Sequence, residues 1–484
     1  MTSVEELALR CLFPGFEGSE APDWVRRRVA SGLGGVVLFA RNVDAPEQLT
    51  ALSDALHGER PQLVIAIDEE GGDVTRLEAR SGSSYPGNLA LGVADDVGLT
   101  RDVAAAIGAE LARRGIDLDL APVADVNSNP LNPVIGVRSF GSDASPVARH
   151  TAAWIEGLQS TGVAACAKHF PGHGDTSIDS HLALPVVDED PHLRALQPFR
   201  SAISSGVKAI MSAHIVATAI DRAPATISRR IMTALLRDEL GFKGIAITDG
   251  LEMRGLSDGV GMTEGAVLSL IAGCDALCIG GGLAGEDAVE DIVRAVAAAI
   301  RQGRLAEERL NEAASRVDAL AAWCSHRGES GRESRDIGLV AARRAVVAEG
   351  PIRIGGEAVV ARFTTPTSMV AGGVPWGMAA ALSTQGVRVS AFDVDAEGGA
   401  HSLEAPLRVA VGKSLVAVVR DLHRRLAQRE AIDSLLGSRP DAVVVEMGLP
   451  LCRPGGAMAY IATNGSARVC AEAAAEVMTG MTAP

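Results

Sequence analysis

The densest group of potentially reactive side chains lies between Lys168 and His181. This segment contains three histidines and two aspartates, and it reads Lys168-His-Phe-Pro-Gly-His-Gly-Asp-Thr-Ser-Ile-Asp-Ser-His181. Such a cluster can hold a metal ion. However, Pro171, Gly172 and Gly174 exclude the regular helix that would place two ligands on one face. We therefore expect neither a metal site nor a cofactor here.

The carboxylate and imidazole at the end of this segment suit acid catalysis better than metal binding. Alternate residues of an extended segment point to the same side, so the carboxylate of Asp179 can reach the imidazole of His181. A carboxylate partner orients the ring and favours its protonated form, which makes histidine a competent general acid near neutral pH. We expect His173 to hold the loop together and His192 to be an exposed surface residue.

A second candidate is Asp249, which follows the apolar run Gly244-Ile-Ala-Ile-Thr248 and precedes Gly250. Thr-Asp-Gly is also an ordinary turn. Placed at the end of a strand, however, an aspartate can attack an anomeric carbon and divide a difficult substitution into two easier steps.

The elements that must position these residues are short, continuous apolar runs. Such runs, without clean alternation, are typical of parallel strands buried on both faces. Seven of them precede residue 280, namely 35–40, 63–67, 118–123, 163–167, 209–212, 244–248 and 276–279. We predict an α/β fold in which residues 1–324 form a (β/α)8 TIM-type barrel. The eighth strand is either irregular or lies in the apolar stretch from Leu7 to Phe13.

The predicted strand ends support a barrel over an open Rossmann-like sheet, for which no dinucleotide fingerprint is present. Active sites of (β/α)8 barrels lie at the C-terminal ends of the strands. Charged or imidazole side chains occur at five predicted strand ends, which carry Asp68, Asp125, Lys168-His169, His214 and Asp249.

A polar segment, residues 325–336, is predicted to be a linker to a smaller α/β sandwich domain at 337–484. Five further apolar runs predict its strands, and they lie at 358–361, 387–392, 407–411, 442–447 and 457–462.

The composition restricts the partners. The 484 residues carry a formal net charge of −15, which argues against nucleic acid or an anionic membrane surface as the main partner. The start of the chain is acidic, and no apolar run approaches the roughly 18 residues of a membrane span. Seven scattered cysteines suggest buried free thiols. We therefore expect a cytoplasmic protein with no nucleic-acid or membrane partner.

Taken together, these motifs resemble glycoside hydrolase family 3, in particular its bacterial β-N-acetylglucosaminidase branch. The string from Lys168 to His181 is highly specific to this branch. Other matching stretches are 34–42, 67–72, 121–127, 132–141, 224–228 and 248–253, with 443–450 and 461–465 in the second domain.

The resemblance implies a retaining exo-β-N-acetylglucosaminidase that removes terminal β-linked N-acetylglucosamine, with peptidoglycan fragments as the oligosaccharide source. Asp249 would be the nucleophile, and the Asp179–His181 pair would act first as acid and then as base. The sugar would be held by Asp68, Arg76, Arg138, Lys168 and His169. Arg138 and Lys168 could instead be ion-pair partners of Asp68 or Asp125.

Two positions depart from the family pattern. Asp73 stands where arginine is frequent, and we expect it to add negative charge near the barrel mouth. Gly250 replaces a frequent second aspartate. Aromatic residues make up only 3% of the chain, so we expect recognition of the sugar to be mainly polar.

Three alternative functions stay open. A histidine acid tolerates phosphate as acceptor, which would make the protein a β-N-acetylglucosaminide phosphorylase. A metal-dependent amidohydrolase would use the histidines as ligands, although the H-x-H expected at its first strand end is missing. An inactive sugar-binding protein is the third, and the complete set of Asp179, His181 and Asp249 speaks against it.

Overall fold

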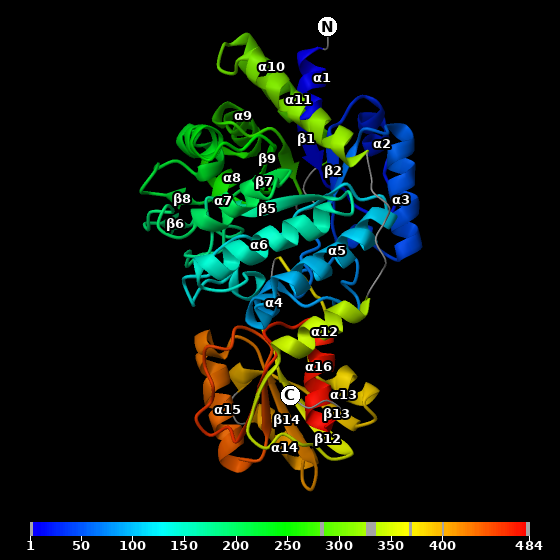
Figure 1. Cartoon of the computed structure of the whole chain (residues 1–484), viewed down its shortest axis with the longest axis vertical. Helices are drawn as coiled ribbons and strands as arrows, with labels where there is room; N and C mark the ends of the chain where they lie inside the picture. The colour runs from blue at the N-terminus through cyan, green and yellow to red at the C-terminus, as the bar shows by residue number, and fades with distance from the viewer. Residues whose placement is uncertain (1–2, 281–284, 326–334, 367–369, 399–400, 481–484) are drawn as a thin grey trace. The chain divides into compact units, whose positions relative to one another are not determined.

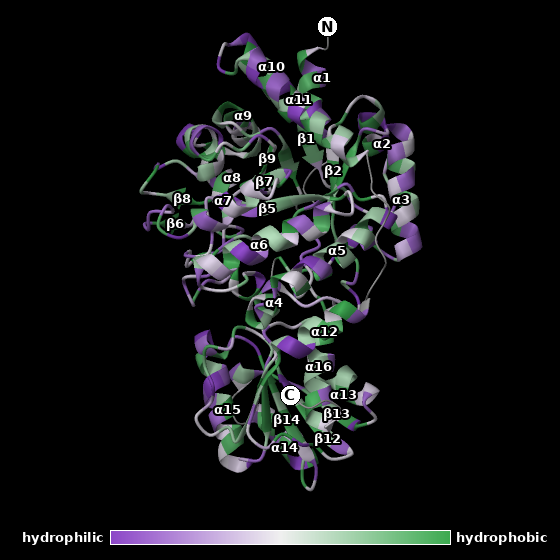
Figure 2. Cartoon of the chain, in the orientation of Figure 1, coloured by the Kyte–Doolittle hydropathy of each residue, from purple (hydrophilic) through white to green (hydrophobic). Residues whose placement is uncertain are grey.

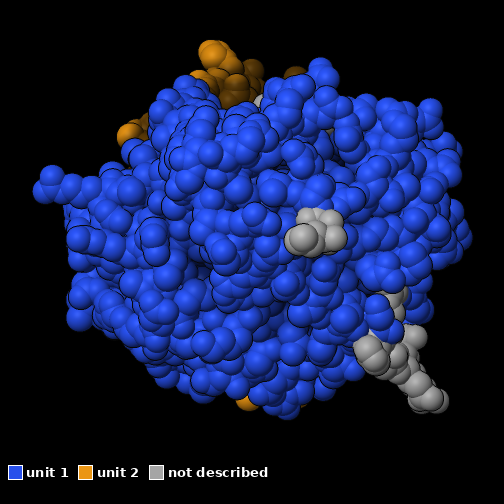
Figure 3. Space-filling model, turned by 90° about the horizontal axis from the view of Figure 1, so that it is seen from above, with its two compact units in different colours: residues 1–70, 100–135, 141–333 blue, residues 71–99, 136–140, 334–484 orange. Residues whose placement is uncertain are grey.

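The computed structural model describes residues 3–280, 285–325, 335–366, 370–398 and 401–480 (Figure 1). They form two compact units, coloured separately in Figure 3. The first unit comprises the described residues within 1–70, 100–135 and 141–333. The second comprises those within 71–99, 136–140 and 334–484.

The first unit is built on parallel strands that follow one another in barrel order. Six form one sheet in the order β2-β3-β4-β5-β7-β9, and β1 pairs in parallel with β10. A bridge between Ile247 and Ala276 joins β9 to the chain entering β10. Beside β2, the Gly34 amide donates to the Leu9 carbonyl at 3.2 Å. The strands are β1 (Leu12–Pro14), β2 (Gly35–Leu38), β3 (Val64–Ile67), β4 (Leu118–Asp119), β5 (Ala164–Phe170), β7 (Ala209–Ser212), β9 (Ile245–Thr248) and β10 (Leu277–Ile279).

These strands confirm the predicted barrel-type α/β fold and decide where its eighth strand lies. Within the predicted stretch, α1 occupies Val4–Arg10 and only Leu12–Pro14 forms a strand. Every residue of β2, β3, β7 and β9 is buried, as expected for parallel strands covered on both faces.

Helices follow most of the strands of the first unit. They are α2 (Asp23–Ala30), α3 (Pro46–Glu59), α5 (Val97–Arg113), α6 (Ala144–Gln159), α7 (Leu196–Ser204), the π-helix η4 (Arg230–Glu239), α8 (Arg254–Val260), α9 (Met262–Ala272), α10 (Glu286–Arg301) and α11 (Glu307–Cys324). The two-residue strands β6 (Val186–Val187) and β8 (Val216–Ala217) pair outside the main sheet. None of the described helices has the length and apolar character needed to cross a membrane.

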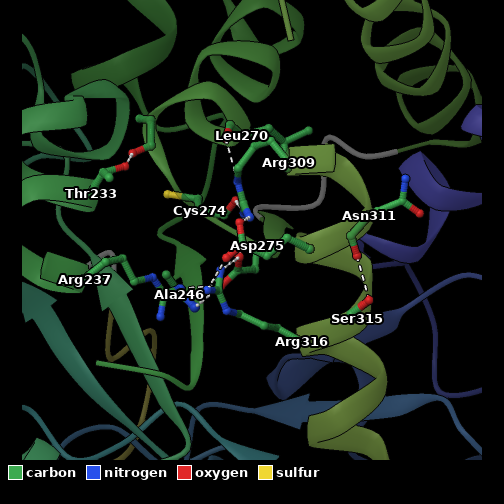
Figure 4. Close-up of polar contacts among 12 residues, drawn as sticks. Thr233, Arg237, Ala246, Leu270, Cys274, Asp275, Arg309, Asn311, Ser315 and Arg316 are labelled. Carbon is green, nitrogen blue, oxygen red and sulfur yellow. Dashed lines mark hydrogen bonds and ion pairs between the residues drawn. The ribbon is translucent and has the colours of Figure 1, made fainter. Parts of the chain in front are cut away.

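A buried ion cluster ties the last strands to their helices (Figure 4). Asp275, just before β10, is fully buried and accepts hydrogen bonds from the Ala246 amide at 2.9 Å and from Arg316 at 3.0 Å. Arg237 and Arg309 bind the same carboxylate. The cluster lies at the N-terminal ends of β9 and β10, the end where barrels place residues for stability rather than catalysis.

The second unit contains a six-stranded sheet in the order β11-β16-β15-β14-β12-β13, in which only the pairing of β11 with β16 is antiparallel. Its central strands are apolar, as their green colour in Figure 2 shows. The strands are β11 (Val347–Glu349), β12 (Glu357–Phe363), β13 (Arg388–Val394), β14 (Ser414–Val419), β15 (Val443–Glu446) and β16 (Ala459–Ala462). The helices are α4 (Asn88–Ala94), α12 (Arg335–Ala345), α13 (Ala379–Thr384), α14 (His401–Val409), α15 (Leu426–Ser438) and α16 (Arg468–Thr479).

One predicted strand of this unit is wrong. The run 407–411 lies mostly in α14, and the strand is formed by the next apolar run, Ser414–Val419. Leu403 and Leu407 are four residues apart, so they lie on one face of a helix. Gly412 then turns the chain with a φ of +73°, and only the run after it reaches the sheet.

Two segments of the first 324 residues belong to the second unit, and Asp73 is part of one of them. Its carboxylate accepts hydrogen bonds from the Ser466 amide at 2.9 Å and the Ser466 hydroxyl at 2.7 Å, and it pairs with Arg420. The guanidinium therefore compensates the negative charge that we expected Asp73 to add. The predicted linker, 325–336, falls largely outside the described residues.

We predict that Gly34→Ala destabilises the first unit. A Cβ at Gly34 would lie 1.8 Å from the Arg10 carbonyl oxygen, so the chain beside β1 must shift. Overpacking of this kind costs about 2 kcal/mol. Thermal unfolding should show a lower midpoint than wild type. Gly58→Ala is the control, because nothing lies within 4 Å of its added Cβ. Equal midpoints for the two variants would contradict the prediction.

Candidate active site

Asp249 lies at the C-terminal end of β9, where the sequence predicts it. Its amide donates to the Ser212 carbonyl at 3.3 Å, and the Gly250 amide donates to its Oδ1 at 2.8 Å. A Cβ at Gly250 would lie 2.8 Å from Glu252 Oε1, and Glu252 Oε2 accepts from the Gly280 amide at 3.1 Å. The glycine therefore lets the Glu252 carboxylate lie close to the turn.

The Asp249 carboxyl is held in its ionised form. Burial acts to raise its pKa, but neighbouring imidazoles and the Gly250 amide together hold the pKa of Asp249 below its ordinary value. The imidazoles are those of His169, His214 and His181. An ionised carboxylate at this position is the form that a nucleophile requires.

His214 contacts the turn that follows Asp249. It is fully buried; its Nε2 lies 2.9 Å from the Gly250 carbonyl oxygen and its Nδ1 2.8 Å from Thr226 Oγ1. Burial lowers the pKa of His214, which favours a neutral ring whose Nε2–H donates to the carbonyl. The sequence placed His214 at a strand end without assigning it this role.

Lys168 and Asp68 meet between the ends of β5 and β3. The Lys168 ammonium pairs with Asp68 and lies 2.7 Å from Glu70 Oε1. All three side chains are buried. The ion pair between Lys168 and Asp68 is one that the sequence allowed, while Glu70 is a partner that it missed. The motif Asp68-Glu-Glu70 was the available signal, because it puts two further carboxylates at the same strand end.

Asp125 holds His169 and the start of the histidine-rich loop. Its carboxylate is fully buried, lies 2.7 Å from His169 Nδ1 and accepts from the His173 amide at 2.6 Å. The bond to Nδ1 leaves the opposite ring nitrogen of His169 for other contacts. Burial acts to raise the pKa of Asp125, but the two histidines hold it below its ordinary value.

The Asp179–His181 contact predicted from the sequence is present. His181 Nδ1 lies 2.7 Å from Asp179 Oδ1, and the same oxygen accepts from the His181 amide at 2.9 Å. Burial raises the pKa of Asp179 and the bonds from His181 lower it, with a net shift downward. The carboxylate is therefore ionised beside the ring. His173 holds the loop as predicted, through Thr176 and Ser180, and His192 is exposed.

Arg76 and Arg138 lie in the second unit, whereas the other predicted site residues lie in the first. Arg76 donates to the Val370 carbonyl at 3.0 Å, and the Arg138 carbonyl accepts from Asn88 at 2.7 Å. Their contact with a sugar stays a prediction. Among the described residues, no group of three or more histidine, cysteine, aspartate or glutamate side chains is arranged to hold a metal ion.

Comparison with known proteins decides the family. Residues 19–320 match the model of the glycosyl hydrolase family 3 N-terminal domain. The chain belongs to this family. This is the family that the sequence motifs predicted.

Three similar proteins are named as hexosaminidases or N-acetylglucosaminidases. Beta-hexosaminidase A of Pseudoalteromonas piscicida is 37% identical over 317 residues, which are 60% of this chain and 53% of that protein. The chain thus spans about half the length of that relative. A beta-hexosaminidase of Alkalilimnicola ehrlichii is 38% identical over 277 residues, 54% of this chain and 78% of that protein. The structure of a family 3 beta-N-acetylglucosaminidase from Paenibacillus sp. str. FPU-7 matches with a TM-score of 0.91 and 31% identity, covering 100% of this chain and 98% of that one.

We predict that His173 makes the fold sensitive to acid. Burial lowers the pKa of its imidazole from 6.5 to about 4. Between these two pH values the unfolded chain binds a proton that the folded chain does not bind. The free energy of unfolding should therefore fall by about 1 kcal/mol per pH unit between these two values. Denaturant titrations at pH 7, 6 and 5 should show a weaker pH dependence for His173→Gln than for wild type. His192→Gln, at an exposed histidine, should match wild type; if both variants do, His173 does not carry the effect.

Proposed function

We propose that this family 3 enzyme is a retaining exo-β-N-acetylglucosaminidase that removes terminal β-linked N-acetylglucosamine by double displacement. The observation that carries the proposal is the 2.7 Å contact between Asp179 and His181, in the same unit as the ionised carboxylate of Asp249. The Asp179–His181 pair can transfer a proton, and the Asp249 carboxylate can attack the anomeric carbon.

In the first half of the reaction, a carboxylate oxygen of Asp249 bonds to the anomeric carbon while the bond to the leaving oxygen breaks. His181 gives the proton on Nε2 to that oxygen, and Asp179 stabilises the imidazolium through Nδ1. The products are a glycosyl–Asp249 ester, a free alcohol and a neutral imidazole.

In the second half, water attacks the anomeric carbon from the side that the alcohol left. Nε2 of His181 takes the proton of this water, and the bond to Asp249 breaks to restore the carboxylate. Two inversions at one carbon give net retention.

We propose that polar side chains of the first unit hold the sugar. Asp68 would accept hydrogen bonds from sugar hydroxyls, and Lys168 would stabilise Asp68 while donating to the same ring. His169, oriented by Asp125 through Nδ1, presents Nε2 to the substrate. The family resemblance adds Arg76 and Arg138.

The substrate class rests on the relatives and on the acid. The names of the relatives, beta-hexosaminidase and beta-N-acetylglucosaminidase, support an N-acetylhexosamine at the non-reducing end. An Asp–His pair carries less negative charge than a lone carboxylate, which suits the anionic peptidoglycan fragments that we propose as the source. Among the described residues no two cysteines form a disulfide, and six of the seven thiols are buried, which supports a reducing compartment such as the cytoplasm.

Water, rather than phosphate, is the proposed acceptor. We expect wild-type protein to release 4-nitrophenol and N-acetylglucosamine from 4-nitrophenyl N-acetyl-β-glucosaminide, with β-N-acetylglucosamine as the first product by NMR. Added phosphate should leave the products unchanged. A sugar 1-phosphate as the main product would overturn the assignment of water in favour of a phosphorylase. Absence of any N-acetylglucosaminide cleavage would overturn the proposed function as a whole.

We predict that His181→Ala separates substrates by leaving group. Protonation by a general acid accelerates a reaction about 100- to 10,000-fold, so cleavage of a poor, alkyl leaving group should fall within that range. The formation of the glycosyl ester from an activated aryl glycoside should fall far less, because its leaving group departs without a proton.

The same variant should accumulate the ester, because water then lacks a base. Mass spectrometry of the digested protein should find one N-acetylglucosaminyl unit on the peptide containing Asp249. His192→Ala serves as the matched control, since that histidine is exposed. Equal losses on both classes of substrate would exclude the acid role, and an adduct on another residue would exclude Asp249 as nucleophile.

A further inference from the structure

The loop that carries His181 has the reverse of the usual surface pattern. In residues 176–187, which we call the acid loop, the polar side chains of Thr176 and Ser180 are buried. Most of the exposed side chains are apolar, namely Ile178, Leu182, Ala183, Leu184 and Val186, and Ser177 is the one exposed polar residue. A run of three exposed apolar residues on a surface loop stabilises nothing in the free protein, so a binding role is the ordinary reason for one.

The buried polar positions fasten the acid loop to the barrel. Ser180 Oγ lies 2.9 Å from His173 Nε2, and the Ser180 carbonyl accepts from the Gly255 amide at 3.0 Å. Further along, the Pro185 carbonyl accepts from the Val216 amide at 2.9 Å, and β6 pairs with β8. The apolar side chains are therefore presented on a backbone that is supported at several points.

The exposure of these side chains is large and concentrated. Ile178 is 45% exposed, Leu182 56%, Leu184 36% and Val186 54%. Four of the fourteen large apolar side chains that are exposed among the described residues thus fall within nine consecutive positions. Scattered exposed leucines need no explanation, whereas a cluster of this density beside one functional residue does.

The place of these residues in the sequence, on both sides of the Asp179–His181 pair, indicates their ligand. His181 protonates the oxygen of the leaving group, so the atoms beyond that oxygen lie on the acid's side of the sugar. Leu182, Ala183 and Leu184 directly follow His181 in sequence, and Ile178 directly precedes Asp179. We infer that the apolar side chains of the acid loop form part of a leaving-group subsite, in which apolar surface on the leaving group strengthens binding.

This inference rests on the proposed function, and a homologous series of substrates tests it separately. Methyl, butyl and hexyl N-acetyl-β-glucosaminides have the same sugar and alcohol leaving groups of similar acidity, but they differ in apolar surface. Burial of part of the hexyl chain should raise kcat/KM about tenfold or more over the methyl glycoside. The ratio of kcat/KM for the hexyl glycoside to kcat/KM for the methyl glycoside should fall below about threefold in the Leu182→Ser, Leu184→Ser double variant. The serine side chains remove the apolar contact with the hexyl chain.

The control is Leu451→Ser, because Leu451 is also 56% exposed but belongs to the second unit; its ratio should equal that of wild type. A wild-type ratio near one, with the methyl glycoside cleaved, would overturn the subsite while the proposed function stands. Failure to cleave any member of the series would instead overturn the proposed function. A double variant with the wild-type ratio would overturn the inference. If that variant also had a different apparent mass from wild type on gel filtration, the cluster would be assigned to contact between copies of the chain.

Discussion

The buried carboxylate of Asp125 is the constraint on which the polar centre of the first unit depends. A charge without exposure to water is tolerated only when hydrogen bonds replace its hydration. Those bonds come from the His169 ring, the His169 amide and the His173 amide. Movement of His169 or of the loop start would remove hydrogen bonds from this buried carboxylate, so its desolvation favours the observed position of both.

The other charged groups of the predicted site are also compensated by their neighbours. Lys168 lies between two carboxylates and compensates part of their charge. Desolvation acts to raise the pKa of Asp249, but nearby imidazoles, those of His169 and His181 among them, and the Gly250 amide hold it below its ordinary value. Asp179, in contrast, has its own imidazole and lies on a loop that remains partly exposed. Asp249, the proposed nucleophile, thus lies at a strand end of the barrel, and His181, the proposed proton donor, lies on a partly exposed loop.

Much of this arrangement could be predicted from residue patterns. The strands of the barrel were predicted because parallel strands buried on both faces require unbroken apolar runs, and Asp68, Lys168, His169 and Asp249 were placed correctly at their ends. The run 407–411 was assigned wrongly because a short apolar run is compatible with either a strand or a helix. The charge of Asp73 was misjudged since its partner, Arg420, is 347 residues away along the chain.

The sequence by itself determined the fold class, the family and the Asp179–His181 pair. All three follow from patterns that are local or repeated along the chain: apolar runs, specific motifs and an alternation of two residues. Only the tertiary structure decided that Asp125 orients His169, that His214 supports the turn beyond Asp249, and which side of the acid loop faces solvent. These features depend on which distant segments pack together, and burial, which sets the cost of each charge and each exposed apolar side chain, is a property of that packing and not of the order of residues.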